Sequence, residues 1–378
     1  MSQPKSKTHL LEHSKAKVTL YGLYLEKYLN ILSRTPFVEK IFIFDLMCGE
    51  GIYENGEKGS PIIALEKIKE HYVFNNFSCP NITVWFNDLG ESKIEPGTPK
   101  VARVERFKKE FELPENIEIQ FSQEDYATIS PKAINLIKRT NKAKGLFFID
   151  PYSYKIIKPE DIKLIMEGGN TEVLLWLPTN FMYRFAEPAV ASDFSGGEPL
   201  KDFITALFGK NPPDFKSKYD FIEKVTSQFK IYLKELGIFV DAFTLESDTK
   251  NVYGLFFFTS HIKGHETMVR ARWELDENRG KGHTVDKSPS FSEVLLSGYP
   301  QKLMNYIKDN NPTNNDIYKF GLENGFLPKH TNEILKGWKR EGEIKVETIS
   351  MDGKPVKGSY IEYDSDRRVR FKISENNL

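Results

Sequence analysis

Short hydrophobic runs alternate with amphipathic segments along about the first half of the chain. Five of these runs, rich in β-branched and aromatic residues, predict buried strands at 40–45, 82–88, 117–121, 145–150 and 172–177. Apolar spacing of three and four residues, together with helix-opening signals, predicts helices at 14–32, from 60 onward, and at 100–112, 131–139 and 159–166. Strands that alternate with helices imply right-handed crossovers, so we expect a parallel sheet with helices on both faces.

The alternation stops after the fifth predicted strand. Residues 179–237 hold helical segments around a loop with Pro212 and Pro213, which predicts a helical insertion. Two further runs, 240–245 and 252–259, are close enough to pair as a hairpin. Five parallel strands closed by a strand pair predict an α/β fold: the Rossmann-like, seven-stranded sheet of class I methyltransferases, here with a helical insertion.

The last part of the chain has a different pattern. Helices are predicted at about 301–309, 314–323 and 330–341, and a hairpin follows around Asp352-Gly353. Three short helices followed by a β-hairpin are typical of a winged helix-turn-helix. We therefore expect two domains, a methyltransferase-like domain over 1–287 and a winged-helix-like domain over 288–378.

Composition narrows the class of protein. Of 378 residues, 39% are hydrophobic and 28% charged, which indicates a folded protein of two or three domains. Two cysteines, Cys48 and Cys79, cannot build a disulfide framework, a four-cysteine zinc site or an iron–sulfur cluster. The polar N-terminal segment lacks a signal-peptide core, and no run has the ~20 apolar residues of a membrane helix. The sequence therefore predicts a cytoplasmic protein with no membrane contact.

Four acidic residues follow the predicted strands: Asp45, Asp88, Asp125 and Asp150. Ligands of doubly wound sheets bind beyond the carboxyl ends of the strands, so these carboxylates mark a candidate site. The alternative is that each one only caps a helix or a turn.

The first acid begins the loop Asp45-Leu46-Met47-Cys48-Gly49-Glu50-Gly51, whose two glycines allow a ligand to approach the backbone. Asp88, at the end of the next strand, is placed to accept hydrogen bonds from both hydroxyls of a ribose. Glu50 inside the turn is expected to repel a pyrophosphate. S-adenosylmethionine has a positive sulfonium and no phosphate, so it is the predicted cofactor, and no metal site is predicted.

The sequence resembles the three-Cys-motif partner proteins over most of residues 9–275. The resemblance rests on short motifs in a fixed order: His13-x-x-x-Lys17, Phe44-Asp45-Leu46-Met47-Cys48-Gly49-Glu50-Gly51-Ile52-Tyr53, Gly59-Ser60-Pro61, Phe148-Ile149-Asp150-Pro151-Tyr152 and Phe258-Thr259-Ser260-His261-x-x-Gly264-x-x-x-Met268. It implies a methyltransferase-like fold, S-adenosylmethionine as cofactor, and a partner protein of radical S-adenosylmethionine type with a three-cysteine motif. The resemblance implies no particular substrate.

Roles for individual residues follow from the resemblance. It places Asp45, Gly49 and Gly51 on the methionine side of the cofactor, Asp88 at the ribose and Asp125 at the adenine. Asp150 is expected to face the methyl group. The loop departs from the commoner pattern at Met47 and Cys48, where small residues or glycine are frequent, and this is expected to narrow the pocket. Met47 is counted with the cofactor-binding residues.

Asp150, Pro151 and Tyr152 are the candidate catalytic residues. Methyltransferases that act on DNA amino groups carry an Asp/Asn-Pro-Pro-aromatic loop after this strand, and its aromatic ring stacks on a flipped base. With one proline, neither alignment of the tripeptide fits that loop, so a DNA adenine methyltransferase is not favoured. The alternative is that Asp150-Pro151 only ends the strand. His261, after an apolar strand, is expected to be structural before catalytic.

The third C-terminal helix carries the basic residues Lys329, His330, Lys336, Lys339 and Arg340, which could contact phosphates. Residues 288–378 nevertheless contain 14 basic and 13 acidic residues, fewer basic than DNA-binding domains usually have. Both nucleic acid and a protein remain candidate partners of this domain.

Three functions are compatible with these features. The first is a methyltransferase that acts on a nucleic acid or on a product of its partner enzyme. The second is a non-catalytic, S-adenosylmethionine-binding scaffold that stabilises or regulates the partner. The third is a metal-dependent nuclease that uses the strand-end carboxylates.

Overall fold

The computed structural model describes residues 8–74, 80–191, 197–247, 251–276, 282–284, 291–349, 363 and 368–374. Cys79 and the predicted turn at Asp352-Gly353 lie outside these residues. The described chain divides into two compact units, Met1–Ala271 with Gly282–Lys287, and Arg272–Lys281 with Ser288–Leu378. The second unit therefore includes the end of the helix before the boundary expected at 288.

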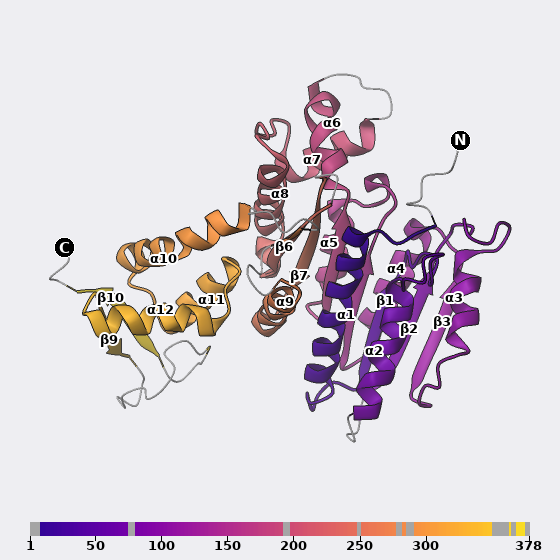
Figure 1. Ribbon diagram of the computed structural model, residues 1–378, viewed down its shortest axis with the longest axis horizontal. Helices are drawn as coiled ribbons and strands as arrows, with labels where there is room; N and C mark the ends of the chain where they lie inside the picture. The colour runs from indigo at the N-terminus through magenta and orange to yellow at the C-terminus, as the bar shows by residue number, and fades with distance from the viewer. Residues whose placement is uncertain are drawn as a thin grey trace. The chain divides into compact units, whose positions relative to one another are not determined.

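A mixed sheet in the order β3-β2-β1-β4-β5-β7-β6-β8 organises the first unit (Figure 1). Its strands are β1 (Lys40–Asp45), β2 (Asn81–Asn87), β3 (Ile117–Ser122), β4 (Ala143–Ile149), β5 (Thr171–Leu177), β6 (Phe239–Glu246), β7 (Val252–Thr259) and β8 (Gly282–Thr284). The first five are parallel, and β7 lies antiparallel between β5 and β6. All seven expected strands are present, and β8 adds a short eighth strand at the edge.

Helices cover both faces of the sheet (Figure 1). They are α1 (Glu12–Leu32), α2 (Ser60–Phe74), α3 (Lys100–Lys108), α4 (Tyr126–Arg139), α5 (Pro159–Met166) and α9 (Ile262–Leu275), with the 3-10 turns η2 (Tyr154–Ile156) and η3 (Lys234–Leu236). Successive side chains of β1 point to opposite faces of the sheet. Phe42 and Phe44 join the core under α4 and α5, whereas Ile41 and Ile43 are buried outside that cluster.

The predicted insertion is helical and consists of α6 (Thr179–Ala191), α7 (Glu198–Phe208) and α8 (Lys218–Tyr232). Its buried face includes Phe203, Phe221 and Phe229. The ring of Phe229 contacts Phe256 and Phe258 of β7, and Phe203 packs on Phe229. The insertion therefore extends the core on the face that α4 and α5 cover.

One helix boundary differs from the expected one for a clear reason. The predicted helix at 131–139 begins at Tyr126, because the side chain of Asp125 caps it by accepting from the Ala127 N–H at 3.2 Å. Pro131 thus lies inside α4, where the buried residues Ile129, Ala133 and Ile137 hold the helix against the sheet.

The second unit contains α10 (Phe291–Asn310), α11 (Asn314–Glu323), α12 (Pro328–Glu341) and the antiparallel pair β9 (Ile344–Thr348) and β10 (Val369–Ile373). Its core is centred on Tyr299, whose ring stacks on Phe326 at a centroid distance of 3.8 Å. The Tyr299 hydroxyl also bonds to Thr331 Oγ1 at 2.6 Å. Three helices and a strand pair match the winged-helix pattern expected here.

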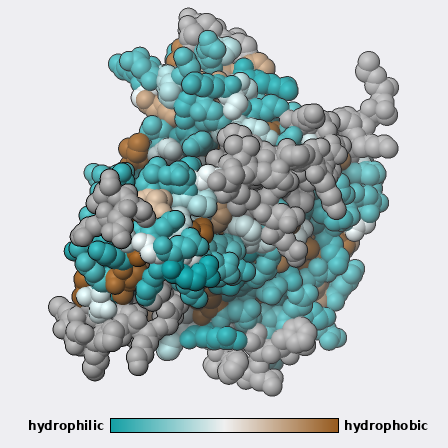
Figure 2. Space-filling model, turned by 60° about the vertical axis from the view of Figure 1, so that its left-hand side comes forward, coloured by the Kyte–Doolittle hydropathy of each residue, from teal (hydrophilic) through white to brown (hydrophobic). Residues whose placement is uncertain are grey.

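Hydrophilic residues dominate the face of the molecule in Figure 2, and hydrophobic residues form small separate groups there. None of the helices that the structure describes is long and apolar enough to cross a lipid bilayer.

Candidate functional site

The turn after β1 depends on its two glycines. Gly49 and Gly51 have φ angles of 73° and 80°, a region that costs other residues energy. This conformation brings the turn against the end of β2: Cys48 N donates to Asn87 O at 3.0 Å, and Gly49 N donates to Asp88 Oδ2 at 2.9 Å. The ends of β1 and β2 therefore meet where a doubly wound sheet binds its ligand.

Asp45, at the end of β1, is completely buried. Ser60 at the start of α2 donates to Asp45 Oδ2 at 2.6 Å, whereas Oδ1 has no hydrogen-bond partner among the described residues. Burial raises the pKa of Asp45 to about 8; the charges of Asp150 and Asp88 add to this rise, and the Ser60 bond and Lys17 oppose it. Asp45 thus offers one buried oxygen that lacks a donor.

Asp88 is also buried and is more fully bonded. Its Oδ1 accepts from Gly90 N at 2.7 Å and lies 3.5 Å from Nζ of Lys100 at the start of α3. The Lys100 ammonium also contacts the Tyr152 hydroxyl and lies 4.0 Å from the centroid of that ring. Lys100 therefore links the predicted ribose-binding acid to the predicted catalytic aromatic residue.

Sequence reasoning missed Lys100. A signal was present, because a lysine in the first turn of a helix lies at the positive end of the helix dipole, where an acid is favoured. Such a position is stabilised when a carboxylate neighbours it in the fold, and Asp88 is that carboxylate.

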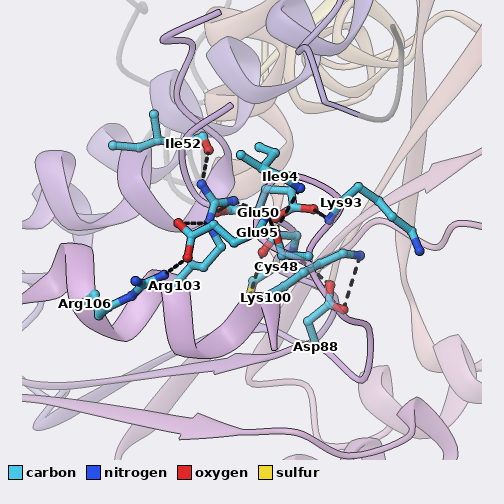
Figure 3. Close-up of polar contacts among 12 residues, drawn as sticks. Cys48, Glu50, Ile52, Asp88, Lys93, Ile94, Glu95, Lys100, Arg103 and Arg106 are labelled. Carbon is cyan, nitrogen blue, oxygen red and sulfur yellow. Dashed lines mark hydrogen bonds and ion pairs between the residues drawn. The ribbon is translucent and has the colours of Figure 1, made fainter. Parts of the chain in front are cut away.

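Glu50 does not make the glycine turn acidic. Arg103 on α3 donates to Glu50 Oε2 at 2.6 Å, and Lys93 N donates to Oε1 at 2.8 Å (Figure 3). Arg103 also reaches the carbonyl oxygens of Glu50 and Ile52, at 3.0 and 3.1 Å, and Glu95 at 3.0 Å. The interpretation that Glu50 would repel a pyrophosphate is therefore wrong, since its charge is neutralised by a buried guanidinium.

Asp150, at the end of β4, forms an ion pair with Lys17 of α1. Lys17 is buried, and its Nζ lies 4.9 Å from the ring centroid of Trp176 at the end of β5. The ring of Trp176 stacks on that of Tyr253 of β7 with a centroid distance of 5.2 Å. The Tyr253 ring in turn stacks on His13 with a centroid distance of 4.9 Å. The His13-x-x-x-Lys17 motif thus fastens α1 to the carboxyl ends of β4 and β5 and to the amino end of the antiparallel β7.

The structure brings some of the predicted site residues together and separates others. Asp45, Asp88 and Asp150 are close enough for the charges of the last two to raise the pKa of the first. Pro151 is buried, and the Tyr152 ring is 69% exposed beside Lys100.

Two predicted cofactor residues have other surroundings. Met47 is half-buried and packs against the core. Asp125 is exposed and caps α4. For Asp125 the structure therefore shows the capping role that sequence analysis left open as the alternative.

Among the described residues, no group of three His, Cys, Asp or Glu side chains is placed to hold a metal ion. Two of the strand-end carboxylates are instead paired with lysines, Asp88 with Lys100 and Asp150 with Lys17. This part of the chain therefore offers no support for a metal-dependent nuclease.

Comparison with known proteins bears on both units. Residues 274–349 match a family described as the GMT-like wHTH domain. Among curated proteins, none matches the chain. Three solved structures resemble it only loosely, with TM-scores between 0.28 and 0.41.

The three structures are the following. Trm1 from Pyrococcus horikoshii, solved with S-adenosyl-L-methionine, is 10% identical, with a TM-score of 0.41 over 94% of this chain and 90% of that one. Protein LPL1258 from Legionella pneumophila is 13% identical, with a TM-score of 0.36 over 65% of this chain and 85% of that one. SCL7 from Oryza sativa is 11% identical, with a TM-score of 0.28 over 65% of this chain and 83% of that one.

The class of protein follows from the strand order. Five parallel strands in the order 3-2-1-4-5, followed by an antiparallel β7 and then β6, form the sheet of class I methyltransferases. The chain has this methyltransferase-like fold, followed by a winged helix-turn-helix domain.

Proposed function

We propose that the chain is an S-adenosylmethionine-dependent methyltransferase related to the three-Cys-motif partner proteins. The observation that carries the proposal is the orphaned Oδ1 of Asp45, completely buried beside the Gly49–Gly51 turn. A buried acceptor without a donor costs about 1–3 kcal/mol. The ammonium of an amino-acid ligand would supply that donor, and the methionine part of the cofactor has such a group.

The described residues fit the rest of the cofactor at the ends of β1 and β2. Asp45, Gly49 and Gly51 would surround the methionine part. For Met47, whose side chain packs against the core, the role rests on the family resemblance alone. Asp88 would accept the ribose hydroxyls when Lys100 moves off its Oδ1. For Asp125, the adenine role rests on the family resemblance alone, because its carboxylate caps α4.

The cofactor would supply the methyl group, and Asp150 with Tyr152 would hold the acceptor. Asp150, which is held by its ion pair with Lys17, would accept a hydrogen bond from an N–H of the methyl acceptor. The exposed Tyr152 follows this carboxylate by two residues, and its ring would offer a face to a planar acceptor. We propose an acceptor from a nucleic acid, or the product of a radical S-adenosylmethionine-type partner with a three-cysteine motif.

One observation favours a second function, a cofactor-binding scaffold without catalysis. Lys100 bonds to Asp88 and Tyr152 together, so the same cation occupies the predicted ribose acid and the predicted catalytic ring. If that arrangement persists with cofactor bound, Tyr152 is not free to hold an acceptor, and the protein would regulate its partner instead.

Calorimetric titration with S-adenosylhomocysteine tests the cofactor site. Wild-type protein should bind at micromolar concentration, and Asp88→Ala should lose that binding. The exposed Asp202 on α7 provides the control, since Asp202→Ala makes the same chemical change far from the turn in sequence. Absence of binding to folded wild-type protein would refute the proposal, and binding without transfer of labelled methyl to nucleic acid or to the partner's product would favour the scaffold.

A further inference from the structure

A pocket of about 290 Å³ lies at the ends of the central strands that are opposite to the candidate site. It is lined by the C-terminal part of α1, the loop from α1 to β1, the first residues of β4 and β5, the turn after β7 and the start of α9. The residues of β4 and β5 in this lining stand at the amino ends of two parallel strands. The pocket is therefore separate from the Asp45–Asp88–Asp150 site, which lies at the carboxyl ends.

The pocket has an apolar wall with unmet polar groups. Tyr28, Leu32 and Phe37 form part of this wall, and Phe37 is 61% exposed. Two polar atoms of lining residues, the Tyr28 hydroxyl and Asn170 Oδ1, are buried and have no hydrogen-bond partner among the described residues. Tyr28 itself is only 5% exposed. A hydroxyl donor and an amide acceptor are thus left for a ligand to satisfy.

Positive charge gathers on the other side of the pocket. Lys144 is half-buried and has no ion pair within the described ranges, and Lys263 pairs with Glu266 at 3.0 Å. Burial lowers the pKa of His261, and the charges of Lys144 and Lys263 lower it further. Lys144 therefore offers an unpaired cation at the pocket.

The acidic residue in the pocket wall is already engaged. Glu172 is half-buried; Thr259 Oγ1 donates to its Oε1 at 2.7 Å, and the Tyr24 hydroxyl donates to its Oε2. Burial raises the pKa of Glu172, whereas the hydrogen bonds from Tyr24 and Thr259 oppose this rise.

Gly264 makes this wall possible and explains a motif that the methyltransferase site does not use. A Cβ at Gly264 would lie 2.2 Å from Glu172 Oε1 and 2.6 Å from Thr259 Oγ1, so only glycine lets α9 approach the Glu172–Thr259 pair. The Thr259-Ser260-His261-x-x-Gly264 segment thus builds one side of the pocket.

We propose that this pocket binds a small aromatic or branched carboxylic acid that also carries an N–H or O–H donor. The hydrocarbon part packs on Tyr28, Leu32 and Phe37. The carboxylate accepts from Lys144 and the Tyr28 hydroxyl, and the donor group bonds to Asn170 Oδ1. The volume is at the lower end for ligand sites, which limits the ligand to a small molecule.

Calorimetry of the full chain with indole-3-acetate and its neutral amide tests the proposal, since these probes differ chiefly in charge. Wild-type protein should bind the acid at least about tenfold more tightly than the amide, as expected for a hydrogen bond to a charged group. Lys144→Gln should abolish that preference. Tyr28→Phe, which keeps the ring, should weaken binding of the acid, and Lys138→Gln on α4 is the matched control.

The remaining outcomes separate this site from the methyltransferase site. Asp88→Ala should still bind the acid, and S-adenosylhomocysteine should not displace it. No saturable binding to folded wild-type protein at millimolar acid, equal binding of acid and amide, or displacement by S-adenosylhomocysteine would each overturn the proposal. Melting curves of Lys144→Gln and Tyr28→Phe establish that a loss of binding is not a loss of folding.

Discussion

Lys17 on α1 and Asp150 at the end of β4 form an ion pair although 133 residues separate them in the sequence. The side chain of Lys17 is 8% exposed and that of Asp150 26%. The pair makes the N-terminal helix a part of the candidate site, because the helix supplies the cation that faces the predicted methyl-transfer residue. We therefore expect that loss of this ion pair affects both the stability of the fold and the chemistry of the site.

Replacing Lys17 by methionine should lower the free energy of unfolding by about 1–3 kcal/mol, since it leaves a partly buried carboxylate without its partner. Urea unfolding measures the change. The double variant Lys17→Met/Asp150→Asn should lose less than the sum of the two single variants, as expected for residues in contact. Lys15→Met on the same helix breaks only the exposed pair with Glu57 and should change little. Additive losses would contradict a direct pair.

Asp45 should make the fold less stable as the pH rises. Its pKa is about 8 in the folded protein and 3.8 in the reference state, so the folded state binds the proton more tightly. Stability contributed by this group is therefore present below pH 4, is lost as the pH rises towards 8, and changes no further above that. The span of about four pKa units corresponds to several kcal/mol by linkage.

Asp45→Asn should remove this dependence while keeping an acceptor for Ser60. Unfolding midpoints measured from pH 4 to 9 should show that the stability of the variant relative to the wild-type protein increases up to pH 8. S-adenosylhomocysteine should bind the wild-type protein more tightly as Asp45 ionises, and Asp45→Asn should lack that rise. Parallel stability profiles for the two proteins would show that Asp45 is already ionised in the fold.

Much of the fold could be predicted from local pattern, because buried parallel strands are short apolar runs that end on recognisable residues. That same rule located Asp45, Asp88 and Asp150 at one edge of the sheet. It did not show which side chains face these acids. Lys100 and Tyr152 lie 52 residues apart, and Glu50 and Arg103 lie 53 apart, so no local pattern joins them. The wrong prediction that Glu50 repels a pyrophosphate has this origin, because the sequence around Glu50 does not reveal that Arg103 neutralises it.

Lys100→Gln should raise the affinity for S-adenosylhomocysteine, since the ammonium no longer shares Asp88 Oδ1 with the ribose hydroxyls. We expect a gain of about tenfold, the effect of one hydrogen bond to a charged group. Calorimetry measures the change, and Lys108→Gln in the last turn of the same helix is the control. A loss of affinity as large as that of Asp88→Ala would show instead that Lys100 itself holds the cofactor.

If the partner of the winged-helix domain is a nucleic acid, α12 would contact its phosphates, because Lys336 and Arg340 are exposed there. Removing a side chain that neutralises one phosphate should reduce the slope of log affinity against log salt concentration by about one for duplex DNA. Fluorescence anisotropy with a labelled duplex should therefore show weaker and less salt-dependent binding for Lys336→Ala/Arg340→Ala, with the exposed Lys302→Ala on α10 unchanged. Wild-type protein that binds no duplex at low salt would leave docking to a protein as the role of this domain, in keeping with its near balance of basic and acidic residues.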